Sequence, residues 1–493
     1  MNKTALIIGA GIGGLSCGVR LAQKGVRVHL FEKEPRVGGY AISYNREGYH
    51  FDLALHVVPS GGPGQEFHSM VESLGLGDTV RFIRLKEGFN VILGNKRFQM
   101  ANNYDELFHD LCREFPAEAQ GLQRLRHDLE KHVTSYAPLF DYTVPKYRSV
   151  PSFLTRLPAF LKHSMMDTAR YLDQFISNDR LKAILFQPAA FMGIPMDNFP
   201  TVNFMMMFYM LMKNGMYTIA GGGQNLTTQL RHKFEELGGT LMTGIGVDKI
   251  IINNKKAVGI RCSDGTTHEA HTIIAATNLL DMVNTLVGRD HFSPTYLANL
   301  DTLSPSVSVL ALNLGLDCHP RDLGITPHIT MVFPDADIDR CMKEQQHRIE
   351  MDGFSITAHC NSDPGISRND HHCLSLIGGT DPRQWLKMTE DDYRRRKEEV
   401  SRLVIQRADH HFPGLQDHIK VMNLATPRTM QRYTANPQGA IMGFNCTCGS
   451  HRAIMKAADL PMGNLIMGGA WTNRLGGFMQ SMKSGILAAE RVK

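Results

Sequence analysis

The hydrophobic pattern begins with two apolar, β-prone runs that flank a helical repeat. The first run is Thr4 to Ile8, and the second is Val26 to Phe31. Between them, apolar residues from Leu15 to Ala22 recur at helical spacing, so that they would share one face. The pattern therefore predicts a strand, a helix and a second strand at the start of the chain.

The next part of the chain follows a different pattern. A short strand is predicted from Tyr49 to His56, and a hairpin is predicted from Phe89 to Leu93 and Arg97 to Met100. From Tyr104 to Val133 the period is helical, and Pro116 can begin a second helix because the first helical position needs no N–H. These segments do not continue a parallel sheet, so we expect them to belong to another lobe.

Strand and helix patterns alternate again from residue 217 onward. Tyr217 to Gly223 reads as a strand that ends in three glycines, and Gln224 to Leu237 reads as a helix. Three strands follow, at Val247 to Asn253, Ala257 to Cys262 and Thr272 to Ala276. We expect the first sheet to resume there.

The last part of the chain leaves the first sheet and returns to it. Residues 291–414 mix strands, at Val307 to Leu314 and Leu374 to Ile377, with charged helices. Asp391 to Asp409 is predicted to be a solvated surface helix because its charges lie all round. Near the C-terminus, the strand Asn464 to Met467 leads into paired glycines and a final helix. The chain is therefore expected to begin and end in one domain.

Glycines join the first predicted strand to its helix in the order Gly9-Ala10-Gly11-Ile12-Gly13-Gly14. In this G-x-G-x-x-G context, Gly9 permits the tight turn, Gly11 lets the backbone approach a pyrophosphate, and Gly14 lets the helix pack close to the strand. The helix N-terminus then offers unpaired N–H groups to the phosphates. Glu32, at the end of the second strand, would accept the ribose hydroxyls and repel a 2′-phosphate, which favours FAD or NAD over NADP.

The segment Arg36-Val37-Gly38-Gly39 follows the second strand closely. An R-x-G-G segment at this place resembles the FAD-binding flavoprotein oxidases rather than the nicotinamide dehydrogenases. The alternative is an ordinary glycine turn after Pro35. No second G-x-G-x-x-G occurs after a strand, so a separate NADPH site is not expected.

Composition narrows the class of protein. The chain has 493 residues, of which 43% are hydrophobic and 20% are charged, so it is globular and can bury more than one core. A net charge of +5 over this length is too weak to indicate nucleic-acid binding. The nine cysteines are scattered apart from Cys446-Thr447-Cys448, which predicts a reduced, cytoplasmic protein without a disulfide framework.

Neither a metal site nor a membrane-spanning segment is predicted. Cys446 with Cys448, or the run His371-His372-Cys373, could offer ligands, but no second pair at zinc-site spacing accompanies them. No run of eighteen apolar residues occurs, and the N-terminal glycines do not fit a signal peptide. The protein is expected to be soluble or attached to one face of a membrane.

Two apolar stretches are candidates for contact with lipid or with an apolar ligand. In residues 144–165, apolar side chains share a helical face that basic residues flank, and Pro158 is expected to divide the stretch into two short helices. Docking on an anionic membrane and packing on the protein itself remain open for this face. Residues 199–216 hold six methionines, which suit a tunnel for a long apolar ligand but also occur in ordinary cores. The predicted substrate-contacting residues are Phe204, Met207, Phe208, Met210 and Leu211.

Several segments occur together in the order of a known family. They are the opening fingerprint, Arg36-x-Gly38-Gly39, GYHFD at 48–52, YTIAGGGQNL at 217–226, TPRTMQRY at 426–433 and a C-terminal GGAW followed by a GG-helix. Over essentially its whole length, the chain resembles the FAD-dependent phytoene desaturases, carotenoid isomerases and retinol saturases. The stretch LFHDLCREFP and the spacing from Pro195 to the triple glycine resemble the isomerase and saturase branch more closely.

The resemblance implies an α/β protein with a Rossmann-type FAD-binding domain, in which a parallel sheet carries a β-meander, and a discontinuous α+β substrate domain. The FAD-binding domain would comprise residues 1–65, 215–290 and 415–493, and the substrate- and membrane-facing domain residues 66–214 and 291–414. The FAD-binding residues expected on this basis are Gly9, Gly11, Gly13, Gly14, Glu32, Lys33, Arg36, Gly38, Gly39, Val247, Gly469, Gly477, Phe478 and Met479.

The resemblance also implies a function. The family members are FAD-dependent oxidoreductases of long apolar polyenes, and a carotenoid or retinoid-like isoprenoid would be desaturated, saturated or isomerised at the flavin. Peripheral attachment to the inner face of the cytoplasmic membrane, and electron exchange with a quinone or another carrier, are further expectations. Two departures leave substrate and direction open: Thr472 to Phe478 replaces a glycine-proline-rich stretch, and Leu53-Ala54 replaces the usual glycine after Phe51-Asp52.

Catalytic residues are harder to predict, because flavin chemistry needs no nucleophile and base pair. Asp52 and His56 are the candidates, as proton-handling or orienting groups near the flavin, and a packed or capping side chain is the alternative for each. Two other functions stay open. A flavin amine oxidase would need an aromatic cage, although Trp471 is one of only two tryptophans. The remaining alternative is a redox-inert, flavin-containing protein associated with a membrane.

Overall fold

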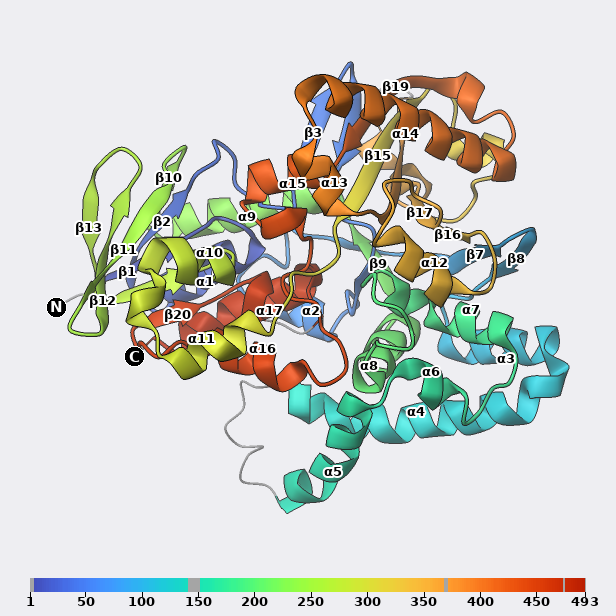
Figure 1. Ribbon diagram of the computed structural model, residues 1–493, viewed down its shortest axis with the longest axis horizontal. Coiled ribbons are helices and arrows are strands. Elements are labelled where there is room, and N and C mark those ends of the chain that lie inside the picture. The colour runs from blue at the N-terminus through green and yellow to red at the C-terminus, as the bar shows by residue number, and fades with distance from the viewer. Residues whose placement is uncertain (1–3, 141–150, 368–370, 473–474, 493) are drawn as a thin grey trace.

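The computed structural model describes residues 4–140, 151–367, 371–472 and 475–492, and the chain forms two lobes (Figure 1). The first lobe, on the left in Figure 1, holds both ends of the chain and a parallel sheet. The second lobe holds a seven-stranded sheet and a group of helices below it.

The first lobe is built around a five-stranded parallel sheet in the order β10-β2-β1-β14-β20. These strands are β10 (Thr240–Thr243), β2 (Arg27–Glu32), β1 (Thr4–Ile8), β14 (Thr272–Ala275) and β20 (Leu465–Met467). Strands from both ends of the chain therefore meet in one sheet, as the sequence predicts. Strand β10 was not predicted, because its four half-polar residues are too few to show an alternating pattern.

Helices cover one face of the parallel sheet and a meander covers the other. The helices are α1 (Ile12–Gln23), α9 (Gly222–Glu236) and α17 (Gly477–Glu490), and the antiparallel meander consists of β11 (Val247–Asn253), β12 (Lys256–Cys262) and β13 (Thr267–Glu269). Short helices α10 (Leu279–Asp281), α11 (Pro294–Asp301) and α16 (His451–Ala458) complete the meander side. The predicted Rossmann-type sheet with a β-meander is confirmed.

The second lobe is built around a seven-stranded sheet in the order β19-β15-β18-β17-β16-β7-β8. Its strands are β19 (Ile419–Ala425), β15 (Val309–Leu316), β18 (His372–Gly379), β17 (Phe354–Thr357), β16 (Ile329–Phe333), β7 (Phe89–Leu93) and β8 (Lys96–Gln99). Neighbouring strands are antiparallel except β16 and β7, which run parallel. One face packs on α13 (Pro382–Lys387) and α14 (Glu390–His411), and the other turns towards the first lobe and the helical group.

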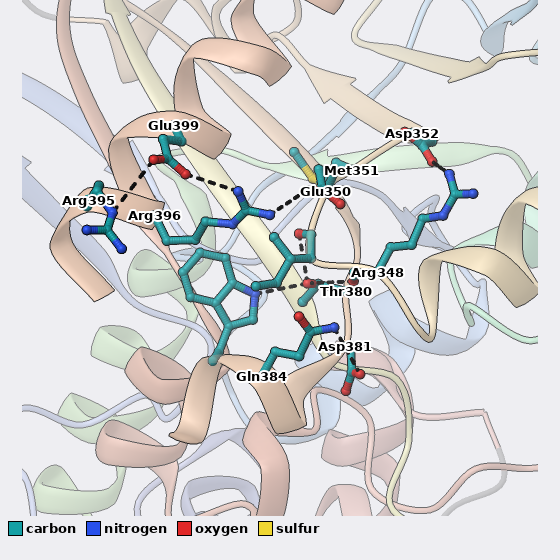
Figure 2. A network of polar contacts seen from close by, with 12 residues as sticks. Arg348, Glu350, Met351, Asp352, Thr380, Asp381, Gln384, Arg395, Arg396 and Glu399 are labelled. Atoms are coloured by element: carbon teal, nitrogen blue, oxygen red, sulfur yellow. Dashed lines mark hydrogen bonds and ion pairs between the residues drawn. The ribbon is translucent and has the colours of Figure 1, made fainter. Parts of the chain in front are cut away.

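Helix α14 is not solvated all round, so that prediction is wrong. Val400, Val404 and Ala408 form a buried stripe against the seven-stranded sheet. The charges on its outer faces made this narrow stripe hard to see in the sequence. One of them, Arg396, forms ion pairs with Glu350 and Glu399 (Figure 2), and the network continues to the fully buried Trp385, whose Nε1 donates to Thr380. The network anchors the segment from Arg348 to Asp352, which leads directly into β17.

The helical group of the second lobe confirms the predicted helices and corrects one boundary. It comprises α3 (Tyr104–Glu114), α4 (Ala119–Phe140), α5 (Pro151–Met165), α6 (Thr168–Leu172), α7 (Asp179–Ala190) and α8 (Thr201–Met212), and α12 (Ile338–Gln345) lies beside it. Pro116 begins a short 3-10 turn before α4. The expectation that Pro158 splits the next stretch is wrong, because α5 continues through it, although an interior proline loses one helical hydrogen bond and crowds the carbonyl four residues earlier.

The predicted membrane face lies partly outside the described residues, which do not include 141–150. On the described end of α5, Leu161 and Met165 are 50% and 73% exposed. Among the residues that the structure describes, no helix is both long enough and apolar enough to cross a bilayer.

The domain boundaries expected from the sequence need adjustment. Helix α2 (Glu66–Ser73) packs in the core of the first lobe, and β6 (Phe82–Arg84) pairs with β9 (Met216–Ile219), next to β5 (Val58–Pro59). Strand β19, in contrast, belongs to the sheet of the second lobe. We therefore propose that the first segment of the FAD-binding domain extends to the end of β6, and that its last segment begins after β19 with α15 (Pro427–Thr434).

Candidate functional site

A cavity of about 520 Å³ lies where the two lobes meet, and we call it the interlobe cavity. Its wall in the first lobe comes from the segments that follow β1, β2 and β14 and from the start of α17. Its wall in the second lobe comes from the seven-stranded sheet. The cavity therefore lies at the carboxyl ends of parallel strands, where open α/β sheets bind their ligands.

Three glycines of the fingerprint are required by contacts within the protein. Gly9 has a φ of +98°, and a Cβ there would lie 2.7 Å from the carbonyl oxygen of Ala276. A Cβ at Gly14 would lie 1.9 Å from the carbonyl oxygen of Gly9, and one at Gly13 would lie 2.5 Å from the Cα of Gly469. These positions allow β1, α1 and the turn before α17 to approach one another closely.

A second set of glycines faces the cavity instead of the protein. A Cβ at Gly477 would have no other atom within 4 Å, and one at Gly11 would meet its nearest atom at 4.0 Å. Gly11 has an extended backbone, with φ −73° and ψ 180°, which any residue can adopt. Gly469 and Gly39 also lie at the cavity wall, where a Cβ would meet its nearest atom at 4.0 Å for Gly469 and at 3.5 Å, the Cα of Gly11, for Gly39. The space beside these glycines fits phosphates that bind backbone N–H groups at the N-termini of α1 and α17.

Glu32 is fixed beside this glycine turn and is only 9% exposed. Its Oε2 accepts a hydrogen bond from the N–H of Ala10 at 2.7 Å, and its Oε1 accepts from the N–H of Glu34 at 3.0 Å. Burial raises the pKa of Glu32, and the two backbone hydrogen bonds oppose that shift. The carboxyl group therefore lies at the cavity wall, where the sequence analysis expects it to accept hydrogen bonds from ribose hydroxyls.

The structure brings most of the predicted cofactor-binding residues to one wall. Those that line the interlobe cavity are Gly9, Gly11, Gly13, Glu32, Lys33, Gly38, Gly39, Val247, Gly469, Gly477 and Phe478. Three predicted residues do not line it. Gly14 packs against the protein, Arg36 is exposed and donates to the carbonyl oxygen of Ser43 at 3.2 Å, and Met479 lines a neighbouring cavity.

Several residues that line the interlobe cavity were not among the predicted cofactor-binding residues. Asn278, Asn436 and Trp471 line the interlobe cavity, and Nε1 of Trp471 donates to Oδ1 of Asn436 at 3.1 Å. Asn278 follows β14, so its place after a strand of the parallel sheet is the signal that could have identified it. Asn436 lies in a loop that only the tertiary fold brings to the cavity.

The part of the interlobe cavity in the second lobe is apolar, and we call it the sheet arm. It is lined by residues within 190–193, 307–311, 331–355 and 377–379. Val309, Ala311, Met331 and Phe333 are typical of its surface. Among the described residues in these ranges, no charged side chain lines the wall.

A second cavity of about 170 Å³ adjoins the first, and we call it the methionine cavity. It is lined by Met192, Met207, Met210, Leu211 and Met479 together with other apolar residues. The two cavities share the lining residues Ala54, His56, Phe191, Met442, Gly477 and Phe478. They therefore meet at the start of α17. This is one end of the wall that holds the predicted cofactor-binding residues, which we call the cofactor wall.

The predicted substrate residues divide between this cavity and the core. Met207, Met210 and Leu211 lie on the wall of the methionine cavity. Phe204 and Phe208 are fully buried, with ring centroids 5.6 Å apart, and belong to the aromatic core of the helical group. The sequence left open whether this helix lines a tunnel or packs in a core. In the structure, some of its residues line a cavity and others pack in the core.

The contacts of Asp52 favour a capping role over a catalytic one. Asp52 ends β4 (Tyr49–Asp52), which pairs with β3 (Ser43–Arg46), and it is 1% exposed. Its Oδ2 accepts from the N–H of Gly223 at 2.6 Å and from the hydroxyl of Ser43 at 3.1 Å. Its Oδ1 accepts from the N–H groups of Leu55 and Ala54. Burial raises the pKa of Asp52, and these hydrogen bonds oppose the shift.

His56 lies where the two cavities meet. Its Nδ1 is 2.8 Å from Oγ1 of Thr357, on the cavity face of β17. Its carbonyl oxygen accepts a hydrogen bond from Nε2 of His328 at 2.8 Å. Burial lowers the pKa of His56 and the pKa of His328 to about 4. Both rings are therefore neutral at neutral pH.

These histidines predict that the protein loses stability in mild acid. Burial also lowers the pKa of His451 to about 4, whereas an unfolded histidine has a pKa of about 6.5. Below pH 6.5 the three histidines bind protons in the unfolded chain but stay unprotonated in the native protein. Each of the three groups then lowers the free energy of unfolding by about 1.4 kcal/mol per pH unit, until the native rings titrate near pH 4.

We expect the melting temperature to be steady above pH 7 and to fall steeply between pH 6.5 and pH 4. Thermal unfolding at half-unit pH intervals measures the slope. The variant His451→Gln should show a shallower slope than the wild-type protein in the same range. A melting temperature that stays constant from pH 7 to pH 4.5 would contradict the neutral, buried state of these rings.

Two groups of potential metal ligands lie away from the cavities, among the described residues. They are His319, Cys360 and His372, and Asp317, Cys318 and His418. In the first group, Nδ1 of His319 accepts a hydrogen bond from the N–H of Arg321 at 3.2 Å. Metal-binding histidines instead donate from their second ring nitrogen. This contact does not favour a ligand role for His319, and we assign no metal to the first group.

Comparison with known proteins identifies the family. Residues 12–493 match the family model described as flavin containing amine oxidoreductase. The chain is 22% identical to all-trans-retinol 13,14-reductase of Danio rerio, over 94% of this chain and 82% of the relative. It is 25% identical to a chloroplastic prolycopene isomerase of Daucus carota, over 88% and 71%. It is 26% identical to a lycopene-forming phytoene desaturase of Paracoccus sp., over 76% and 75%.

A solved structure shares the fold. Putrescine oxidase, in a structure with bound putrescine, has a TM-score of 0.66 and 14% identity, and the match covers 99% of this chain and 98% of that chain. At this identity, the likeness concerns the fold alone.

Proposed function

Because the chain belongs to the family of flavin containing amine oxidoreductases, we propose that it is an FAD-dependent oxidoreductase of a long apolar polyene, a carotenoid or retinoid-like isoprenoid. FAD is the cofactor of this family. The observation that carries the substrate class is the pair of apolar cavities that meet beside the cofactor wall. A ligand that extends from the sheet arm into the methionine cavity would be long, narrow and uncharged.

The residues at the cavity wall fit FAD. Gly11, Gly39, Gly469 and Gly477 leave room for its phosphates and rings beside the N-termini of α1 and α17, and Glu32 is placed for a ribose. When bound, FAD supplies the two-electron redox chemistry. The chain itself binds and orients the polyene, through the sheet arm on one side and Met207, Met210 and Leu211 on the other, and these apolar walls exclude water.

The cavities favour a polyene over an amine. An amine substrate carries a positive charge, and among the described residues neither the sheet arm nor the methionine cavity offers it a carboxylate. Putrescine oxidase shares the fold, so an amine oxidase remains the alternative to be tested.

The test compares three polyenes whose names occur among the relatives' activities. Host cells that accumulate phytoene or prolycopene express the protein, and purified holoprotein is incubated with all-trans-retinol. Mass spectra and absorption spectra of the lipid extracts then separate the outcomes: loss of two hydrogens indicates desaturation, gain of two indicates saturation, and an unchanged mass with a new spectrum indicates isomerisation. Peroxide release from putrescine, with all three polyenes unchanged, would contradict the proposal.

Filling the methionine cavity should block the polyene without displacing FAD. The substitution Met207→Trp adds bulk to a wall of a cavity of only about 170 Å³. We expect turnover of the accepted polyene to fall about tenfold or more, and the flavin content to stay unchanged. The control is Met455→Trp, because Met455 is 41% exposed and lines neither cavity. Full turnover in Met207→Trp would show that the polyene does not use this cavity.

We also propose that the protein attaches peripherally to the inner face of the cytoplasmic membrane and exchanges electrons with a quinone or another carrier. Leu161 and Met165 are exposed on α5 beside Lys162, and α5 lies at the lower edge of the molecule in Figure 1. Apolar side chains next to a cation suit an anionic lipid surface. Co-sedimentation with vesicles of anionic phospholipid tests the attachment, and anaerobic reoxidation of the reduced protein by a quinone tests the carrier.

A further inference from the structure

Among the described residues that line the sheet arm and the methionine cavity, His56 is the one with an ionisable side chain. We call these two spaces together the apolar region. Of the six residues that line both cavities, only His56 can gain or lose a proton. The other described residues of the methionine cavity and of the sheet arm are apolar or carry uncharged amides and a hydroxyl. Among the described residues, His56 is therefore the side chain that is placed to exchange a proton with a ligand in this region.

We propose that the reaction adds or removes hydrogen rather than isomerising a double bond, and that His56 is the side chain that exchanges the proton with the polyene. This inference rests on the function proposed above and goes further, because it selects among the three reactions that the relatives perform.

The contacts of His56 hold its ring in one orientation. Nδ1 is engaged by Oγ1 of Thr357 at 2.8 Å, and Thr357 is fully buried. Nε2 is then the ring nitrogen that remains available to a ligand in the cavities. Nε2 of His328 holds the carbonyl oxygen of His56, which fixes the backbone as well. A side chain with one nitrogen held and the other facing an apolar cavity suits transfer of a proton to or from a bound ligand.

Asp52, the other candidate, has no comparable access. All four of its hydrogen bonds go to the protein, and it lines neither cavity. The two residues are close in sequence but serve different purposes, since Asp52 holds the turn before α9 while His56 faces the ligand.

The proposed step balances in atoms and electrons. In the desaturating direction, one carbon of a CH–CH unit loses a hydride, with its electron pair, and FAD held beside the glycines and Glu32 would supply the two-electron acceptor. The neighbouring carbon loses its proton to Nε2 of His56, and the electrons of that C–H bond form the second bond of the new C=C. In the saturating direction, His56 would take up a proton from solvent and pass it to one carbon, while the other carbon gains a hydride for which reduced FAD would be the donor. Isomerisation moves neither a hydride nor a proton to the product.

The surroundings keep His56 ready to accept the proton. Burial lowers its pKa to about 4, so that the ring is neutral at neutral pH, and in the tautomer whose Nδ1–H donates to Oγ1 of Thr357 the lone pair of Nε2 is free. The titratable groups around it are His328 and His359. The ring centroid of His359 is 6.2 Å from that of His56. Asp363 lies near His328, and His50 lies near His359. The neighbouring histidines oppose a positive charge on His56, so the proton is not retained after the step.

The test uses purified holoprotein with three substitutions. His56→Gln keeps a hydrogen-bonding group of similar size but cannot accept a proton, and we expect turnover of the accepted polyene to fall about 100-fold to 1,000-fold with FAD retained. Thr357→Val, which removes the positioning contact, should lower kcat with little change in KM, and Thr357→Ser should restore it. The matched control is His232→Gln, because His232 is exposed on α9. If the polyene is desaturated, the wild-type protein should lose kcat/KM as the pH falls towards the pKa of His56, and His56→Gln should lack this limb; the comparison uses only pH values at which thermal unfolding shows both proteins to be folded.

A second readout does not depend on turnover. With ¹³C-labelled histidine in the holoprotein, the ring signal of His56, assigned by its absence in His56→Gln, should shift when retinol, phytoene or prolycopene is added. If none of the three is converted, the proposed function fails, and this signal still reports on His56. Unchanged turnover in His56→Gln, conversion with no change in polyene mass, or a His56 signal that none of the polyenes moves would each overturn the inference.

Discussion

The variant Gly11→Ala is expected to fold like the wild-type protein and to lose its FAD. The backbone at residue 11 is extended, and a methyl group there would meet no protein atom closer than 4.0 Å. The methyl group would instead enter the interlobe cavity, where the pyrophosphate must approach the N-terminus of α1. A displacement that weakens FAD binding about 100-fold corresponds to about 2.8 kcal/mol.

The matched variant Gly14→Ala is expected to fail at an earlier stage. Its methyl group would lie 1.9 Å from the carbonyl oxygen of Gly9, and backbone cannot give way as a flexible side chain can. The measurements are circular dichroism, thermal unfolding and the ratio of flavin to protein absorbance after purification. Gly11→Ala should give a native spectrum and little flavin, and Gly14→Ala should give little soluble protein. Full flavin content in Gly11→Ala would contradict the placement of the cofactor.

Removal of the Asp52 carboxyl group is the second large effect. Asp52→Ala leaves the buried N–H groups of Gly223, Leu55 and Ala54 without their acceptor. An unsatisfied buried donor costs about 1–3 kcal/mol, so we expect the variant to lose about 3–5 kcal/mol of unfolding free energy. For a lobe of this size, that loss lowers the melting temperature by about 10 °C.

The controls for Asp52 separate a structural role from a catalytic one. Ser43→Ala removes one of the four hydrogen bonds and should cost only about 1 kcal/mol. Turnover per bound flavin should be unchanged in Asp52→Ala protein that remains folded, because the residue lines neither cavity. If Asp52→Ala keeps its melting temperature but loses turnover, the structural role is contradicted and a catalytic role is indicated.

The sequence predicted best what depends on neighbours along the chain. The glycine turn, Glu32 and the strand–helix–strand unit are local, so their spacing alone predicted a dinucleotide site at this place in the chain. The same fingerprint could not separate glycines that the protein needs for packing, such as Gly14, from those that leave room for a ligand, such as Gly11. That distinction depends on which atoms lie opposite each Cα in the folded protein.

Features that depend on tertiary contact were predicted less well. Asn436 reaches the cavity only through the fold, and the buried stripe of α14 was hidden among its charges. Within α8, the composition did not show which residues face the methionine cavity, because methionine and phenylalanine suit a core and a tunnel equally. The contrast between Asp52 and His56 likewise needed the hydrogen bonds, since Asp52 ends β4 and His56 follows only four residues later.

The most direct test of the whole account is a single anaerobic turnover. Purified holoprotein, with its FAD oxidised or reduced, is mixed with stoichiometric retinol, phytoene or prolycopene, and the flavin spectrum and the polyene mass are recorded together. We predict that, for one polyene, a change in flavin redox state accompanies the gain or loss of two hydrogens in equal amounts. A flavin that responds to putrescine but to none of the polyenes would contradict the account.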